Sequence, residues 1–153
     1  MENNKNIEMF DIFASYIFEK TYKEFPKCIN IEIQKELKIL LDELDASLSF
    51  DEKSIIFTES VLWLSNNGFI RYAHPNIKRP IQPVAIESFM CVELTLKGLN
   101  LLKSPIPQTL TQKTVGNEII EKFKEGSISE AGKLTMNAIL STGANKILGS
   151  NDE

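Results

Sequence analysis

Two stretches in the middle of the chain decide the fold: TESVLWLSNNGFIRY at residues 58–72 and ESFMCVELTLKGLNLL at residues 87–102. The first has apolar residues at helical spacing up to Leu64, followed by the helix stop signal Asn67-Gly68. The aromatic and β-branched residues of Phe69–Tyr72 then predict a strand. In the second stretch, an imperfect apolar alternation over Val84–Leu94 predicts the returning strand of a hairpin.

A short helix is predicted to follow the second strand. Thr95 is the expected N-cap of a helix over Leu96–Lys103, because its hydroxyl can accept a hydrogen bond from a free backbone N–H. Between the two strands, three prolines predict that Ala73–Pro83 is an irregular, wing-like loop, since proline removes a donor and restricts the residue before it. The central stretch is therefore expected to be a helix, a hairpin and a capped helix.

The run Leu94-Thr95-Leu96-Lys97-Gly98-Leu99 resembles the LTxKG segment that closes the wing in MarR-like and PadR-like winged-helix regulators. Trp63-Leu64 with Gly68-Phe69-Ile70 resembles the end of the recognition helix and the start of the first wing strand in the same superfamily. The resemblance implies an α+β, mainly α, winged helix-turn-helix with a small antiparallel hairpin and C-terminal helices. It does not by itself imply a regulator, because function resides in sites and not in folds.

Helices are also predicted before this central stretch. Apolar residues spaced by three and four predict a first helix over Met9–Phe25. Lys27–Ile29 is expected to be a short strand, and Asn30 the cap of a second helix. A capping box at Ser49 predicts a third helix that runs to Asn67, although Ile55-Ile56-Phe57 also fits an extended conformation. Within the third helix, Trp63 is predicted to lie in the core.

The domain organisation follows from breaks in this pattern. A winged-helix domain is expected over residues 7–104, a Pro- and Thr-rich linker over residues 105–114, and a C-terminal helical segment over residues 115–148. The C-terminal segment combines apolar residues with small ones that allow helices to approach closely. Two readings stay open: the segment forms a homodimer through an exposed apolar stripe, or it packs back on the same domain.

Composition limits the class of protein. The chain has 153 residues, of which 42% are hydrophobic and 25% charged, as in ordinary globular proteins. Its net charge is −4, which counts against strong DNA binding because nucleic-acid domains are usually basic. No leader and no long apolar run are seen, which predicts a cytoplasmic protein without a membrane partner. Cys28 and Cys91 form no CxxC motif and are expected to be reduced thiols packed as small apolar residues.

The candidate site is a nucleic-acid interface. No acidic residue occurs from Phe69 to Ile86, so a cationic wing is expected to contact phosphates. The candidate contacts are Arg71, Lys78 and Arg79 with His74 in the wing, and Ser54, Ser60 and Asn66 in the third helix. Carboxylates in the third helix (Asp51, Glu52 and Glu59) oppose this interpretation, since they repel phosphate.

The leading hypothesis is a small non-enzymatic winged-helix protein that acts as a transcriptional regulator or accessory factor on double-stranded DNA. The alternative is a protein–protein interaction module that uses a winged helix as its scaffold. No catalytic, metal or cofactor site is predicted. His74 is the only histidine and has no orienting partner in sequence, and the cluster Asp42, Glu43 and Asp45 is interpreted as a solvated face.

Overall fold

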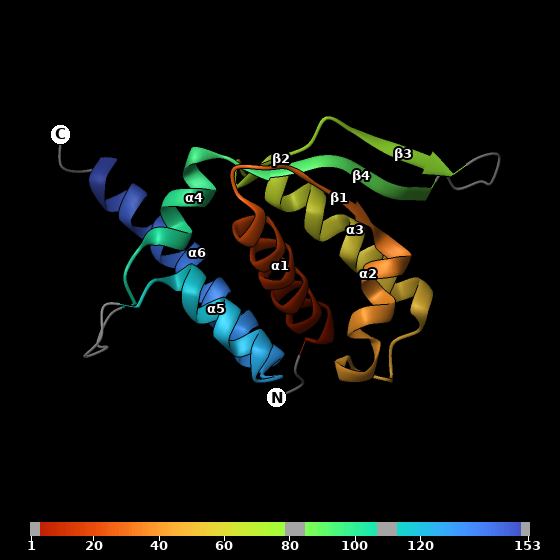
Figure 1. Cartoon of the computed structure of the whole chain (residues 1–153). Helices are drawn as coiled ribbons and strands as arrows, with labels where there is room; N and C mark the ends of the chain where they lie inside the picture. Colours follow the sequence, from red (N-terminus) through yellow and green to blue (C-terminus); the bar gives the residue numbers. More distant parts are fainter. Residues whose placement is uncertain (1–3, 79–84, 107–112, 151–153) are drawn as a thin grey trace.

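The computed structural model describes the backbone of residues 4–78, 85–106 and 113–150, and their side chains except those of 78, 85 and 143–150. In these ranges the chain is α+β and mainly helical (Figure 1). The elements in chain order are α1 (Lys5–Glu24), β1 (Ile29–Glu32), α2 (Ile33–Leu40), the 3-10 helix η1 (Leu41–Glu43), α3 (Phe50–Asn66), β2 (Ile70–Arg71), β3 (His74–Lys78), β4 (Ala85–Leu94), α4 (Leu96–Lys103), α5 (Val115–Lys124) and α6 (Ile128–Ser150).

Helix α1 is the centre of the core. Its N-terminus is capped by Asn4, whose side-chain oxygen accepts hydrogen bonds from two free N–H groups of the first turn. Phe13, Ile17 and Phe18 are completely buried. The helix contacts α3 and β4 as well as α5 and α6. In Figure 1 it lies between α3 on one side and α5 and α6 on the other. The burial of its large side chains stabilises the fold.

Strand β4 is the middle of a small antiparallel sheet. Strand β1 pairs along one edge of β4, and β2 and β3 pair along the other, so that Phe89 lies opposite both Ile31 and Pro75. Phe89 and Val92 are completely buried, which places the sheet against the helical core. The predicted pairing of Phe69–Tyr72 with Val84–Leu94 is confirmed at Ile70 and Arg71.

A β-bulge explains why the apolar alternation of β4 is imperfect. Ile29 and Ile31 are two residues apart on β1, yet their partners Val92 and Phe89 are three residues apart on β4. The extra residue falls at Cys91, whose φ of 54° lies in the left-handed region. A bulge of this kind shifts the inward face by one residue, so the buried positions no longer alternate.

Two predictions for the flanking segments were wrong. The first strand spans Ile29–Glu32 and leads directly into α2, so Asn30 lies in the strand and does not cap the helix. The wing is also more regular than expected, because His74–Lys78 forms β3. Pro75 is tolerated there because β3 lies at an edge of the sheet, where within the described residues it pairs only with β4.

The predicted helix signals at Ser49, Gly68 and Thr95 are confirmed. Ser49 caps α3 by accepting a hydrogen bond from the Glu52 N–H, and the extended alternative for residues 55–57 was wrong because they lie in α3. Gly68 follows the end of α3 with a φ of 81°, as a left-handed residue after a helix should. Thr95 caps α4 through the Gly98 N–H at 3.1 Å.

The described part of the C-terminal helices packs back on the rest of the chain. Helices α5 and α6 contact α1, α4 and each other. Two glycines allow this close approach: a Cβ atom on Gly116 would lie 2.5 Å from the ring of Tyr22, and one on Gly132 would lie 3.0 Å from the backbone of Asp11. A homodimer through this segment stays a prediction. No helix in the described ranges combines the length and the apolar character needed to cross a membrane.

Candidate functional site

The outer face of α3 forms one wall of a groove. Eight residues line this groove, which has a volume of ≈ 340 Å³, and we call it the α1–α3 groove. They are Asn6 and Phe10 from α1, and Ile55, Ile56, Glu59, Leu62, Trp63 and Asn66 from α3. The α3 residues recur at intervals of three and four, which is the spacing of one helix face. Residues of both helices therefore line one groove.

Trp63 lies on this surface and not in the core, so its predicted burial was wrong. Its side chain is 38% exposed. The indole contacts Phe10 edge-to-face at 5.2 Å between ring centroids and stacks on Phe69 at 6.3 Å. These contacts fix the orientation of the indole while one side of it faces the groove. Ile55, two turns earlier on α3, is 63% exposed, so two exposed apolar residues of α3 line the groove.

The charge of this face is negative. Of the described residues that line the groove, Glu59 alone is ionisable. Asp51 and Glu52, in the first turn of α3, are exposed as well, whereas Lys53 is buried. An acidic, partly apolar surface repels phosphate and attracts cationic side chains.

The predicted base-reading residues of α3 are not brought together. Ser60 is completely buried, and its hydroxyl donates a hydrogen bond to the Ile56 carbonyl at 2.7 Å. Its prediction as a DNA contact was therefore wrong, since the side chain has no access to a nucleic-acid groove. Ser54 is half-buried, while Asn66 is exposed and lines the α1–α3 groove.

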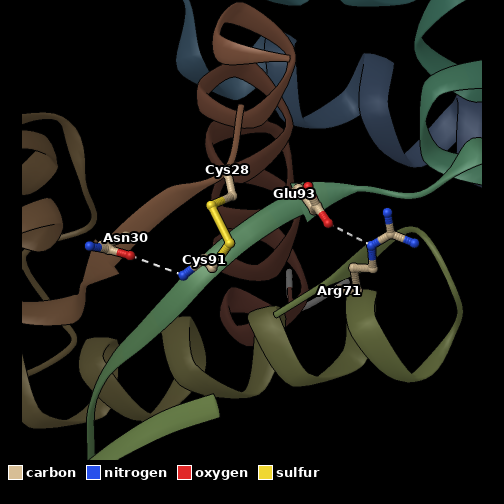
Figure 2. Close-up of a disulfide and its surroundings, with 5 residues drawn as sticks. All are labelled: Cys28, Asn30, Arg71, Cys91 and Glu93. Carbon is tan, nitrogen blue, oxygen red and sulfur yellow. Dashed lines mark hydrogen bonds and ion pairs between the residues drawn. A yellow bond between two sulfur atoms is a disulfide. The ribbon is translucent and has the colours of Figure 1, made fainter. Parts of the chain in front are cut away.

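The cationic wing is only partly assembled in the described residues. Arg71 donates from Nε to Oε1 of Glu93 at 2.7 Å across the β2–β4 pair, as Figure 2 shows. This pairing compensates the charge that was predicted to hold phosphate. His74 is exposed on β3. Lys78 ends β3 but its side chain lies outside the described residues, as does all of Arg79.

The two cysteines form a disulfide, so their prediction as reduced, buried thiols was wrong. Cys28, just before β1, is joined to Cys91 on β4, with 4.8 Å between the Cα atoms (Figure 2). Cys28 is exposed and Cys91 is half-buried. The Cys91 N–H donates to the side-chain oxygen of Asn30 at 2.9 Å. The covalent bond and the hydrogen bond together hold β1 to β4 at the bulge.

Two ionisable groups near α1 have perturbed pKa values. Burial, and then the negative charge of Glu8, raise the pKa of Asp11 to about 6. Burial and a hydrogen bond to the Glu36 carboxylate raise the pKa of Tyr16 above its usual range. Neither group lies in the α1–α3 groove. In the part of the chain that the structure describes, no cluster of His, Cys, Asp and Glu is able to hold a metal ion.

Comparison with known proteins gives no relative to this chain: no family model, no curated protein and no solved structure matches it. Its function must therefore be inferred from its own surface.

The groove was missed because Trp63 was assigned to the core from helical spacing alone. A usable signal was present, since Ile55, Glu59 and Trp63 recur every four residues. A carboxylate in the middle of an apolar row is rare inside a core. That pattern indicates a row at the surface.

Proposed function

We propose that this chain is a non-enzymatic protein-interaction module, built on a winged-helix scaffold, whose α1–α3 groove binds a helical segment of another protein. The proposal rests on one observation: Ile55 and Trp63 of α3 are exposed, and both line the groove together with Glu59, which lies between them in the sequence. Large apolar side chains that form one surface are commonly covered by a partner. Tryptophan in particular is enriched among the residues that dominate binding energy.

The partner is identified by complementarity to this surface. A groove between two helices accepts the apolar face of an amphipathic helix. The carboxylate of Glu59 lies within the groove and Asp51 and Glu52 lie nearby on α3, so the bound helix should carry lysine or arginine beside its apolar anchors. The same acidic residues argue against α3 as a base-reading helix.

The order of the elements supports the winged-helix scaffold. Helix α1 is followed by a short strand, two helices and a hairpin, with β1 and the hairpin joined in one antiparallel sheet. The LTxKG-like segment joins the last residue of β4 to the first turn of α4.

A library of displayed helical peptides, selected on the full chain, tests the groove. The selected peptides should share apolar residues at helical spacing together with lysine or arginine. Glu59→Lys and Ile55→Ser should each weaken their binding by at least about five-fold, since the loss of an anchor contact costs more than about 1 kcal/mol. Leu96→Ser is the matched control, because Leu96 is 74% exposed on α4, away from the groove. Equal affinity of the selected peptides for the wild type and for both groove variants would rule out this site.

DNA contact through the wing is the second candidate function. The hairpin of β3 and β4 extends beyond the helices in Figure 1, and β3 carries His74 and Lys78 without any acidic residue. Fluorescence anisotropy with a labelled duplex at low salt should then show binding that is lost when Arg71, Lys78 and Arg79 are changed to glutamate. Equal binding by this triple variant would exclude the wing as the contact.

A further inference from the structure

The disulfide lies at an accessible and conformationally restrained point of the sheet. Cys28 is exposed in the connection between α1 and β1, and Cys91 is half-buried on β4. Cys91 has a φ of 54°, a conformation that costs free energy for a residue with a side chain. Its N–H bond to Asn30 and its covalent bond to Cys28 both restrain it there.

We infer that Cys28–Cys91 is a site of reversible thiol–disulfide exchange, with a low-molecular-weight thiol as the reductant. This inference is independent of the α1–α3 groove. The attacked atom is the sulfur of Cys28, because Cys28 is the more exposed residue and exchange requires access to the sulfur.

The exchange balances in two steps. A thiolate of the small molecule attacks Cys28 Sγ, the bond between the two protein sulfurs breaks, and Cys91 leaves as a thiolate that takes up a proton. A second thiolate then attacks the small-molecule sulfur of the mixed disulfide and releases Cys28. The protein gains two electrons and two protons, and two small thiols become one small disulfide. Oxidation is the reverse of this sequence, with the small disulfide as the oxidant.

The sheet makes the reaction reversible. The pairs Ile29↔Val92 and Ile31↔Phe89 flank the disulfide and do not depend on it. They hold the two cysteines close after reduction, so that the second step of reoxidation is intramolecular and has a high effective concentration. Figure 2 also shows Glu93 turned to Arg71, so that its charge is compensated near the leaving Cys91 thiolate.

Reduction should loosen β1 in particular. Without the covalent bond, Cys91 leaves the left-handed conformation more often, which breaks its hydrogen bond to Asn30 while the flanking strand pairs stay formed for most of the time. Strand β1 leads into α2 with no intervening residue, so the change extends to the start of that helix. Amide hydrogen exchange of residues 29–32 and 88–92 should rise on reduction, while that of α1 stays slow.

The experiment is a titration of the full, folded chain with mixtures of reduced and oxidised glutathione. Trapping of free thiols with an alkylating agent, read by mass, should give the same ratio of dithiol to disulfide from the reduced and the oxidised side. A glutathione adduct, if captured, should be on Cys28. A disulfide that yields only in denaturant, an adduct on Cys91, or end points that differ with the starting state would overturn the inference.

Two single variants provide a second measurement. Cys91→Ser leaves Cys28 alone and should react with oxidised glutathione about ten-fold faster than Cys28→Ser, which leaves the less accessible Cys91. Equal rates, or the opposite order, would contradict the assignment of Cys28 as the attacked atom. Far-UV circular dichroism establishes that both variants are folded, and the titration of the wild-type chain decides the question if either is not.

Discussion

The substitution Asp11→Asn should stabilise the protein at neutral pH and leave its stability almost unchanged in acid. Asp11 lies on α1 where Gly132 of α6 approaches it, with 3.1 Å between the Asp11 Cβ and a Cβ placed on Gly132. One carboxylate oxygen, Oδ1, is buried and has no hydrogen-bond partner in the described structure. A buried, unsatisfied charge destabilises the folded state.

The sign and size follow from the pKa of Asp11, which burial and then Glu8 raise from 3.8 to about 6. Below pH 3.8, both the folded and the unfolded chains carry a protonated Asp11, and its burial costs no charge-related stability. As the pH rises through this interval, the unfolded chain loses the proton more readily, so stability falls until the folded carboxyl is also ionised. At 1.36 kcal/mol per pKa unit the full difference is about 3 kcal/mol, and partial exposure to water reduces it to about 1–2 kcal/mol.

The assay is urea denaturation of the wild type and the variant at several pH values from 4 to 7.5. The variant should exceed the wild type by about 1–2 kcal/mol at pH 7 and by much less near pH 4. Asp42→Asn, at an exposed position, controls for the loss of one negative charge. A stability difference that does not change with pH, or a wild type that is the more stable at pH 7, would refute the assigned environment of Asp11.

Three further predictions concern the core and its connections. Gly98→Ala should lower the free energy of unfolding by about 3 kcal/mol, because its Cβ would lie 2.1 Å from the Phe69 carbonyl oxygen; chemical denaturation measures this. Joint replacement of Cys28 and Cys91 by serine should lower the free energy of unfolding by up to about 4 kcal/mol, because the unfolded chain gains the entropy of the freed loop between two residues separated by 63 positions. A thermal shift equal to that of an exposed serine substitution would contradict this prediction. Trp63→Ala should cost about 1–2 kcal/mol in a thermal melt, less than the 3–5 kcal/mol that a buried tryptophan of this size would imply.

Local features of the fold were predictable because their signals are contained within a few residues. The caps Ser49 and Thr95, and the left-handed Gly68, each satisfy backbone groups of the next or preceding turn. Such hydrogen bonds depend on the identity of one residue and its neighbours. They fixed the limits of α3 and α4 without any knowledge of the rest of the structure.

Features that depend on pairing between distant segments were not predictable in the same way. The disulfide requires β1 to lie beside β4 in one register, and the bulge at Cys91 sets that register. No local pattern around Cys28 specifies either. The exposure of Trp63 is a related case, because α3 has apolar residues around much of its circumference. Periodicity alone does not then identify the face that α1 covers.

The LTxKG-like residues make contacts that hold α4 in place. The Thr95 hydroxyl donates to the Gly68 carbonyl while it caps α4. Gly98 lets the helix approach the Phe69 carbonyl closely. Both residues therefore attach α4 to the turn between α3 and β2.

Lys97, the charged residue of the same segment, has a similar structural role. Its ammonium group donates to the Asn67 carbonyl at 2.8 Å and lies 4.5 Å from the centre of the Phe69 ring. A lysine held by a helix C-terminus and an aromatic face is stabilised within the protein and has less to offer a phosphate. The residues of this segment thus stabilise the fold, and other residues determine which ligand binds. Because the paired Arg71 and the acidic face of α3 both oppose DNA, the exposed row from Ile55 to Trp63 is the stronger guide to function.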